Sequence, residues 1–287
     1  MTTVQDLGRP GYAHLGISAS GAADALSLRA GNLLVGNAEG AAALEMTLAG
    51  GTFEFESGAL VALTGADFDA SIPLWQTTEV KPGGQVRCGH ARSGARCYLC
   101  VRGGIAVPPV LGSASTHLVT GLGGFEGRAL RRGDVLTLGS ASDPANGPAN
   151  GNVARRTVAA PAPHPAIRVT MVRESVDLCG QAWQVSEDSD RMGLRLCGPV
   201  LASGAGHMLT EGVPLGAVQL PPDGQPIILF VEHQTTGGYP KIANVISADF
   251  HALGQLRPRD QVRFELVSIE AALALLRRQE EWLHALV

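Results

Sequence analysis

The sequence predicts a mainly β protein built from two similar halves joined by a linker. Short apolar stretches are separated by turns rich in glycine, of which the chain has 37 among 287 residues. Only two segments show the apolar spacing of a helix. A segment rich in proline and alanine divides the chain, and similar motifs recur on both sides of it. These observations favour β-barrels or β-sandwiches with few helices.

Seven stretches have the length and alternation of short strands. They are residues 52–56, 59–64, 97–101, 135–138, 167–172, 227–231 and 261–266. Cys97 and Cys100 form a C-x-x-C on the third of these, where residues three apart point to opposite faces. We therefore expect these two, and the other three cysteines, to be reduced and mostly buried thiols of a cytoplasmic protein.

Two segments are predicted to be helical. Residues 22–34 place leucine and alanine on one face, and Ser20 is the expected N-cap. Residues 268–286 carry an apolar stripe opposite a charged face, with Ser268 as the expected N-cap. We expect that stripe to be ordinary packing and not a groove for a partner.

Residues 141–165 read as a linker because proline, alanine, asparagine and glycine dominate and no apolar period is present. We therefore expect an N-terminal domain over 1–140 and a C-terminal domain over 166–287. The halves resemble each other: LRRGD at 130–134 and LRPRD at 256–260 each precede a predicted strand. A duplication of this kind makes the cleft between the copies the first place to look for a binding site.

Composition argues against several classes of function. The net charge is −4 and no basic run exceeds two residues, which disfavours nucleic-acid binding. No apolar stretch approaches the length of a membrane span. The only lysines, Lys81 and Lys241, lie in neither a phosphate-binding loop nor a biotin-attachment setting, and the histidines lack metal spacing. We expect no metal and no covalent biotin on this chain, so ATP would be used through a complex.

The sequence QTTGGYP at 234–240 is the most informative run. It follows an apolar stretch and combines an amide, two hydroxyls, two glycines and a phenol. Glycines let backbone N–H groups approach a ligand, and the side chains are neutral donors and acceptors. A hairpin corner whose polar groups bond only to each other explains the run equally well.

Many short motifs resemble one family. They include TVQDLGRPGY at 3–12, SGAAD at 20–24, NLLVGN at 32–37, LEMT at 44–47, LGSAST at 111–116, SDRMGLRL at 189–196, GAVQ at 216–219 and QTTGGYP at 234–240. Together they resemble the biotin-dependent carboxyltransferase family, also called the allophanate hydrolase subunit 2 family, over nearly the whole chain. The resemblance implies two cyclophilin-like β-barrel domains related by a pseudo-twofold duplication.

The resemblance also implies a function. Stand-alone members are similar to component C of the ATP-dependent 5-oxoprolinase, which opens 5-oxoproline to L-glutamate together with components B and A and is not expected to act alone. Relatives form the carboxyltransferase component of urea carboxylase, for which the chain is short and has no carrier lysine. Another alternative is a binding regulator of a kinase-inhibitor-like partner.

Opening a lactam requires groups that bind a small carboxylate, polarise an amide and stabilise developing charge. Arginine forks suit the carboxylate, and neutral amides and hydroxyls suit the lactam. The candidate catalytic residues are Glu211, Gln219 and Arg191. The candidate substrate-binding residues are Gln5, Asp6, Arg9, Arg195, Gln234, Thr235, Thr236, Gly237, Gly238, Tyr239, Ser113 and Thr116.

Structural roles compete with some of these interpretations. Each arginine is equally able to pin a turn, and Asp24 is expected to favour a helix start. A Ser20–His14–Asp24 triad lacks the G-x-S-x-G elbow. His233 is expected to be a strand-end side chain.

Overall fold

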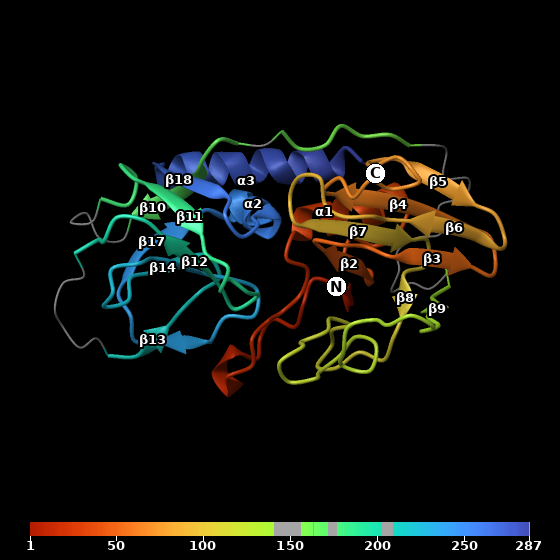
Figure 1. The fold of residues 1–287 in the computed structure, drawn as a ribbon, viewed down its shortest axis with the longest axis horizontal. Coiled ribbons are helices and arrows are strands. Elements are labelled where there is room, and N and C mark those ends of the chain that lie inside the picture. Colours follow the sequence, from red (N-terminus) through yellow and green to blue (C-terminus); the bar gives the residue numbers. More distant parts are fainter. Residues whose placement is uncertain (141–155, 163, 172–176, 203–208, 287) are drawn as a thin grey trace. The chain divides into compact units, whose positions relative to one another are not determined.

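The computed structural model describes residues 1–140, 156–162, 164–171, 177–202 and 209–286, which fall into two compact units (Figure 1). The first unit comprises Met1–Arg9, Ser20–Pro161 and Glu281–Val287, and the second comprises Pro10–Ala19 and Ala162–Glu280. Strands dominate both units, which confirms the predicted mainly β class. Each unit has its own sheets.

An antiparallel five-stranded sheet forms the centre of the first unit. Its strands are ordered β1 (Thr2–Gln5), β2 (Ala43–Thr47), β7 (Arg96–Val101), β4 (Ala59–Gly65) and β5 (Thr77–Val80). Smaller sheets pair β3 (Thr52–Phe55) with β6 (Gly84–Arg87), and β8 (Ile105–Ala106) with β9 (Thr137–Leu138). The hydrogen-bonded order of the five strands is open, with β1 and β5 at its edges.

Strand β7 is covered on both faces. Cys97 belongs to one apolar cluster and Cys100 to another, as expected for residues three apart on a strand. Both are free thiols, and burial raises the pKa of each well above its ordinary value. They are therefore packing residues. With Cys88 they make three of the five cysteines buried, as predicted, whereas Cys197 is exposed.

Helix α1 (Ala25–Leu34) packs on β4 and β7. Its N-cap is Asp24, whose carboxylate accepts the Ser27 N–H at 2.9 Å. The predicted cap, Ser20, is wrong, because its hydroxyl donates to the Thr116 carbonyl at 3.4 Å instead. A Cβ on Gly31 would lie only 2.6 Å from Cys100 Sγ, so a glycine here lets the helix approach the sheet.

The second unit contains a closed seven-stranded barrel. Around it run β10 (Ile167–Met171), β17 (Lys241–Val245), β14 (Ala217–Gln219), β15 (Ile227–Leu229), β12 (Gly193–Cys197), β11 (Ala182–Val185) and β18 (Gln261–Leu266). Only the β10–β18 pairing is parallel among these strands. Buried Val262 and Phe264 alternate with exposed neighbours on β18, because one face of each strand lines the core.

The short helices η3 (Ser247–Asp249) and α2 (Phe250–Gln255) lie between β17 and β18 in the sequence, and η1 (Ala13–Leu15) lies between β1 and α1. Helix α3 (Ile269–His284) follows β18, and Ser268 caps it as predicted by accepting the Ala271 N–H. Its apolar stripe is packed only in part: Leu283 is buried, whereas Ile269 is 65% exposed. No helix in the described part of the chain is long and apolar enough to cross a membrane.

The repeated motifs at 130–134 and 256–260 fold into the same turn. In the first unit the Asp134 carboxylate accepts the Arg131 N–H at 2.7 Å. In the second unit the Asp260 carboxylate accepts the Arg257 N–H at 2.8 Å. Arg128 also contacts Asp134, and this lowers the pKa of that carboxyl to about 2. The equivalent turns support the predicted duplication.

Some predicted boundaries differ from the observed ones. Strand β18 coincides with its prediction, but β9 begins at Thr137 and not at 135, where Val135 is 73% exposed. Strand β15 ends at Leu229, two residues before the predicted end, although the Phe230 N–H still donates to the Met192 carbonyl at 3.0 Å, in line with the β12–β15 register. Most of the predicted linker, residues 141–155 and 163, lies outside the described residues. Its later part pairs with the first unit through Thr157 and Gln76.

Candidate functional site

In the first unit, a group of predicted site residues surrounds Asp6. One carboxylate oxygen accepts hydrogen bonds from Gly8 N at 2.7 Å, Ser113 Oγ at 2.6 Å and Ser115 Oγ at 2.5 Å. The other accepts from Ala114 N at 2.6 Å. The end of β1 thereby holds the loop of residues 110–116, and the Asp6 carboxylate has a structural role.

Arg9 and Thr116 hold the same loop from two further points. Arg9 is 2% exposed and donates to the carbonyls of Val110 and Ser115. The Thr116 hydroxyl donates to the Val4 carbonyl at 2.9 Å. The Arg9 guanidinium therefore donates to backbone carbonyls and fixes a turn, which is one of the two roles that the sequence predicts for each arginine.

Gln5 is the predicted residue in this unit with unused hydrogen-bonding capacity. Its side chain is buried, and its Nε2 donates to Thr3 Oγ1 and to the Thr116 carbonyl, each at 3.1 Å. Its Oε1 has no hydrogen-bond partner among the residues that the structure describes. A buried carbonyl without a partner is costly, and so this oxygen is a candidate acceptor for a ligand N–H.

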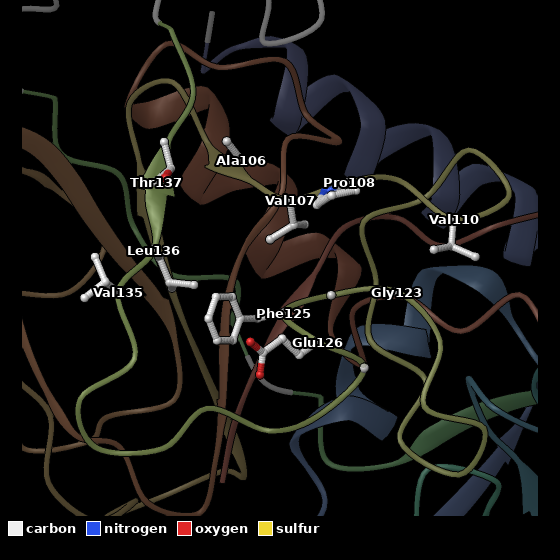
Figure 2. Close-up of a pocket in the computed structure, with 12 residues that line it drawn as sticks. Ala106, Val107, Pro108, Val110, Gly123, Phe125, Glu126, Val135, Leu136 and Thr137 are labelled. Atoms are coloured by element: carbon white, nitrogen blue, oxygen red, sulfur yellow. The ribbon is translucent and has the colours of Figure 1, made fainter.

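A hollow of about 440 Å³ lies beside this loop (Figure 2). Its lining is mostly apolar and contains none of the predicted site residues: Ala106, Val107, Pro108, Val110, Gly123, Gly124, Phe125, Glu126, Gly127, Val135, Leu136 and Thr137. A Cβ on Gly123 would lie 2.9 Å from Arg9 Nη2, and one on Gly124 only 1.9 Å from Thr116 Oγ1. Glycines therefore allow this wall to pack closely on the Arg9 loop.

In the second unit, the QTTGGYP run forms part of a small two-stranded sheet. Strand β16 (Thr236–Gly237) pairs antiparallel with β13 (Glu211–Gly212), so that Glu211 lies opposite Gly237. The Val213 N–H donates to the Thr235 carbonyl at 3.1 Å. The pairing brings Glu211 to the run, although 23 or more residues separate them in the sequence.

Two glutamine side chains meet beside this two-stranded sheet. Gln219 is 1% exposed; its Oε1 accepts from Gln234 Nε2 at 3.3 Å, and its Nε2 donates to the Tyr239 carbonyl at 3.4 Å. A Cβ on Gly237 would lie 2.6 Å from Gln219 Nε2, so an alanine there would force the Gln219 amide to move. Tyr239 itself is 45% exposed.

Lys241 joins this group from β17. Its Nζ lies 3.3 Å from Glu211 Oε1 and 3.4 Å from the Gly212 carbonyl oxygen. We call Glu211, Gln219, Gln234, Gly237 and Lys241 the glutamine corner. Lys241 was missed in the sequence, although it is one of only two lysines and follows the QTTGGYP run directly.

The strand register orders the residues of the corner. Arg195 pairs with Ile227, Ile227 with Gln219, and Gln219 with Lys241, in one row across β12, β15, β14 and β17. A β-bulge between Val218 and Gln219 adjusts the last pairing. Lys241 is thus the immediate neighbour of Gln219, whereas Arg195 stands two strands away on an exposed position.

Arg191 has a buried partner. Its Nε lies 2.5 Å from Glu232 Oε1, and the two side chains are 10% and 2% exposed. The Glu232 N–H also donates to the Arg191 carbonyl at 2.8 Å. Beside this pair, His233 Nδ1 contacts the Gln234 carbonyl at 2.6 Å, and burial lowers the pKa of His233. His233 lies in the loop between β15 and β16, and not at the strand end that the sequence predicts, because β15 ends at Leu229.

Other polar residues have structural roles. Glu45 was missed in the sequence: it is buried, and its Oε2 accepts from Tyr98 Oη at 2.6 Å and Ala23 N at 2.8 Å. Burial, together with Glu45, raises the pKa of Tyr98, so the phenol is a neutral donor. His14 Nδ1 contacts the Gly11 carbonyl, and Asp24 caps α1, so neither contact indicates a triad. Within the described residues, no cluster of three potential metal ligands occurs.

Comparison with known proteins shows which family of proteins this chain belongs to. Residues 15–266 match the carboxyltransferase domain, subdomain A and B, and the chain belongs to that family. It is 39% identical over 298 residues to component C of the 5-oxoprolinase of Haemophilus influenzae, covering 98% of this chain and 93% of that one. It is 41% identical over 295 residues to component C of the 5-oxoprolinase of Escherichia coli, covering 99% and 94%.

A solved structure shares the fold over the whole chain. The urea amidolyase of Kluyveromyces lactis superposes with a TM-score of 0.92 at 30% identity, covering 100% of this chain. This chain spans 19% of that enzyme, which is therefore much longer. The family that the motifs predict is confirmed by these matches.

Proposed function

We propose that this chain is component C of a 5-oxoprolinase. The supporting observation is the extent of the similarity: two relatives with that name align with 98% and 99% of this chain and with over nine tenths of their own length. Because this chain and each of the two relatives have nearly the same length, the match favours the same role for the whole protein over one domain shared by proteins of different function. The chain then acts in a multi-component amidohydrolase that opens 5-oxoproline to L-glutamate.

The partners and the energy source are part of the proposal. Component B of the enzyme binds this chain, component A completes ring opening, and the complex consumes ATP to activate the lactam. Phosphorylation of the lactam oxygen would convert a resonance-stabilised amide into a better electrophile. The chain is not active alone, and the reaction takes place in the cytoplasm.

The glutamine corner is the proposed lactam site. A lactam offers one carbonyl acceptor and one N–H donor, and the carboxamides of Gln219 and Gln234 offer the complementary donors and acceptors. Glu211 is the proposed base, and the residues from Thr235 to Tyr239 the proposed rim. In the first unit, considered by itself, Gln5 is a separate proposed ligand contact; Asp6, Arg9, Ser113 and Thr116 support it by ordering their loop.

Reconstitution tests the function. This chain, purified with components A and B, is expected to release glutamate from 5-oxoproline in an ATP-dependent reaction, and a mixture without this chain is expected to release none. Glutamate is measured with a coupled dehydrogenase assay. Equal glutamate release with and without this chain would contradict the proposal.

Gly237→Ala tests the glutamine corner. The new methyl would meet Gln219 Nε2 at 2.6 Å, so the amide must move, and turnover by the reconstituted complex is expected to fall about tenfold or more. Gly212→Ala is the matched control, because its methyl meets nothing within 4 Å on the partner strand. Equal activities of the two variants would place the lactam site elsewhere.

Carboxyl transfer to urea is the second candidate. It is favoured by the match to urea amidolyase over the full chain. This activity requires a biotinylated carrier, which this chain would receive from another protein. Bicarbonate- and urea-dependent ATP consumption with such a carrier, combined with no glutamate release from 5-oxoproline, would favour it over the first proposal.

A further inference from the structure

We propose that Lys241 supplies the positive charge that binds the carboxylate of the substrate at the glutamine corner. The site would then select small cyclic amides that carry an anionic group beside the ring nitrogen. This inference rests on the proposed function, and it assigns to a lysine the role that the sequence suggested for arginine.

The buried arginines are poorly suited to exchange partners. Arg191 and Glu232 form an ion pair with side chains 10% and 2% exposed. Moving Arg191 to a ligand would separate Glu232 from this buried guanidinium, which is strongly unfavourable. Arg9 is 2% exposed and donates to two backbone carbonyls that define its loop. Both guanidiniums therefore have structural partners that a small ligand cannot easily replace.

Lys241 is in the opposite situation. Its side chain is 21% exposed and its partner Glu211 is 40% exposed, with 3.3 Å between Nζ and Oε1. Solvated ion pairs of this kind are weak, and so a substrate carboxylate can replace Glu211 at little cost. The Gly212 carbonyl, 3.4 Å from Nζ, keeps the ammonium near the β13–β16 pair during the exchange.

The register places the charge at a suitable distance from the amides. Lys241 and Gln219 are direct cross-strand partners, whose Cβ atoms typically lie about 5 Å apart. In 5-oxoproline the carboxylate is attached to the ring carbon next to the lactam nitrogen. One small molecule can therefore contact the ammonium with its carboxylate and, with its lactam, the exposed Gln234 carboxamide, which donates to Gln219 Oε1 at 3.3 Å. Arg195 lies on the other side of Gln219 in this row, two strands away, which corresponds to about 10 Å at the usual strand spacing.

The residue type fits this role. The chain uses 20 arginines and 2 lysines, yet it has a lysine at this position. An ammonium is a compact point charge, whereas a guanidinium is a broad fork that needs planar partners. Beside the narrow space that Gly237 leaves for Gln219, the smaller group fits more easily.

Steady-state kinetics of the reconstituted complex test the inference. Lys241→Met is expected to raise the KM for 5-oxoproline about 10- to 100-fold, as for loss of a charge-assisted hydrogen bond, with kcat changed by less than about threefold. Lys241→Arg, which keeps the charge on a broader group, is expected to recover only part of that loss. Glu211→Gln removes the competing carboxylate, so its KM is expected to fall severalfold even if kcat is reduced.

A ligand without the carboxylate separates charge recognition from general damage. Inhibition by 2-pyrrolidone, the same lactam without the acid, is expected to be equally weak in the wild-type complex and in Lys241→Met. Lys81→Met is the matched control for removing a lysine, because Lys81 is exposed in the other unit.

Two results would overturn the inference: a KM that is unchanged in Lys241→Met, whatever the effect on kcat, or an equal KM increase in Lys241→Met and Lys81→Met. Each of these requires an active wild-type complex. If the wild-type complex itself releases no glutamate, the proposed function is wrong, and that outcome is distinct from a failure of the lysine assignment.

Discussion

Glu232→Gln is expected to lower the free energy of unfolding by about 3 kcal/mol. The substitution removes a carboxylate that lies 2.5 Å from the Arg191 guanidinium, with side chains 2% and 10% exposed. Removing one partner of a buried pair typically costs about 3–5 kcal/mol, because the remaining charge keeps its desolvation penalty. Thermal and urea unfolding of the whole chain provide the measurement.

The second unit offers a matched control for this prediction. Glu187 contacts Arg259 at 2.7 Å, but the side chains are 62% and 80% exposed. Glu187→Gln makes the same chemical change in a solvent-exposed ion pair, and its effect on the free energy of unfolding is expected to stay below about 1 kcal/mol. Equal losses for the two variants would mean that burial does not decide the strength of the Arg191–Glu232 pair.

Removing both charges together is expected to cost less stability than removing one of them. Arg191→Met combined with Glu232→Met removes both charges and keeps apolar volume. It is expected to be less destabilising than Glu232→Gln alone, since no uncompensated charge stays in the pair. If the stability loss of this double variant equalled the sum of the losses of Arg191→Met and Glu232→Met, each side chain would act through its other contacts and not through the pair.

The sequence pattern predicted those strands and helices whose residues alternate or repeat with a clear apolar period. The strand at 261–266 alternates apolar and polar residues, and β18 has the same bounds. The opposite orientation of Cys97 and Cys100 followed from the period of a strand alone. Helix α1 was predicted, but its cap was misplaced by four residues, because Ser20 and Asp24 are both good caps and the Thr116 loop determines the role of Ser20.

The candidate site was only partly predictable, because its contacts depend on strand pairing between distant segments. Gln219 and Lys241 lie 22 residues apart and meet through the β14–β17 ladder, while Glu45 meets Tyr98 across the β2–β7 pair. Motif similarity found Gln219 and Gln234. It did not show that Arg9 and Arg191 have buried partners, because whether an arginine faces a ligand or a carbonyl is a property of the folded loop.

Asp6→Ala is expected to give the largest loss in the first unit, about 3–5 kcal/mol. The Asp6 carboxylate accepts four hydrogen bonds, from Gly8 N, Ser113 Oγ, Ala114 N and Ser115 Oγ, at 2.5–2.7 Å. A buried donor that loses its acceptor costs about 1–3 kcal/mol. Asp6 is 9% exposed, so water can replace only part of this shell.

Graded substitutions at this carboxylate test that reasoning. Ser113→Ala removes one donor and is expected to cost about 1 kcal/mol. Asp6→Asn keeps an acceptor at the oxygen shared by three donors, but it turns an amide N–H₂ towards the Ala114 N–H. Its loss is therefore expected to fall between those of Ser113→Ala and Asp6→Ala, in urea unfolding of the whole chain. Asp188→Ala, at an exposed position, is expected to change little. If Asp6→Ala cost no more than Asp188→Ala, the carboxylate would not be the group that holds the 110–116 loop to β1.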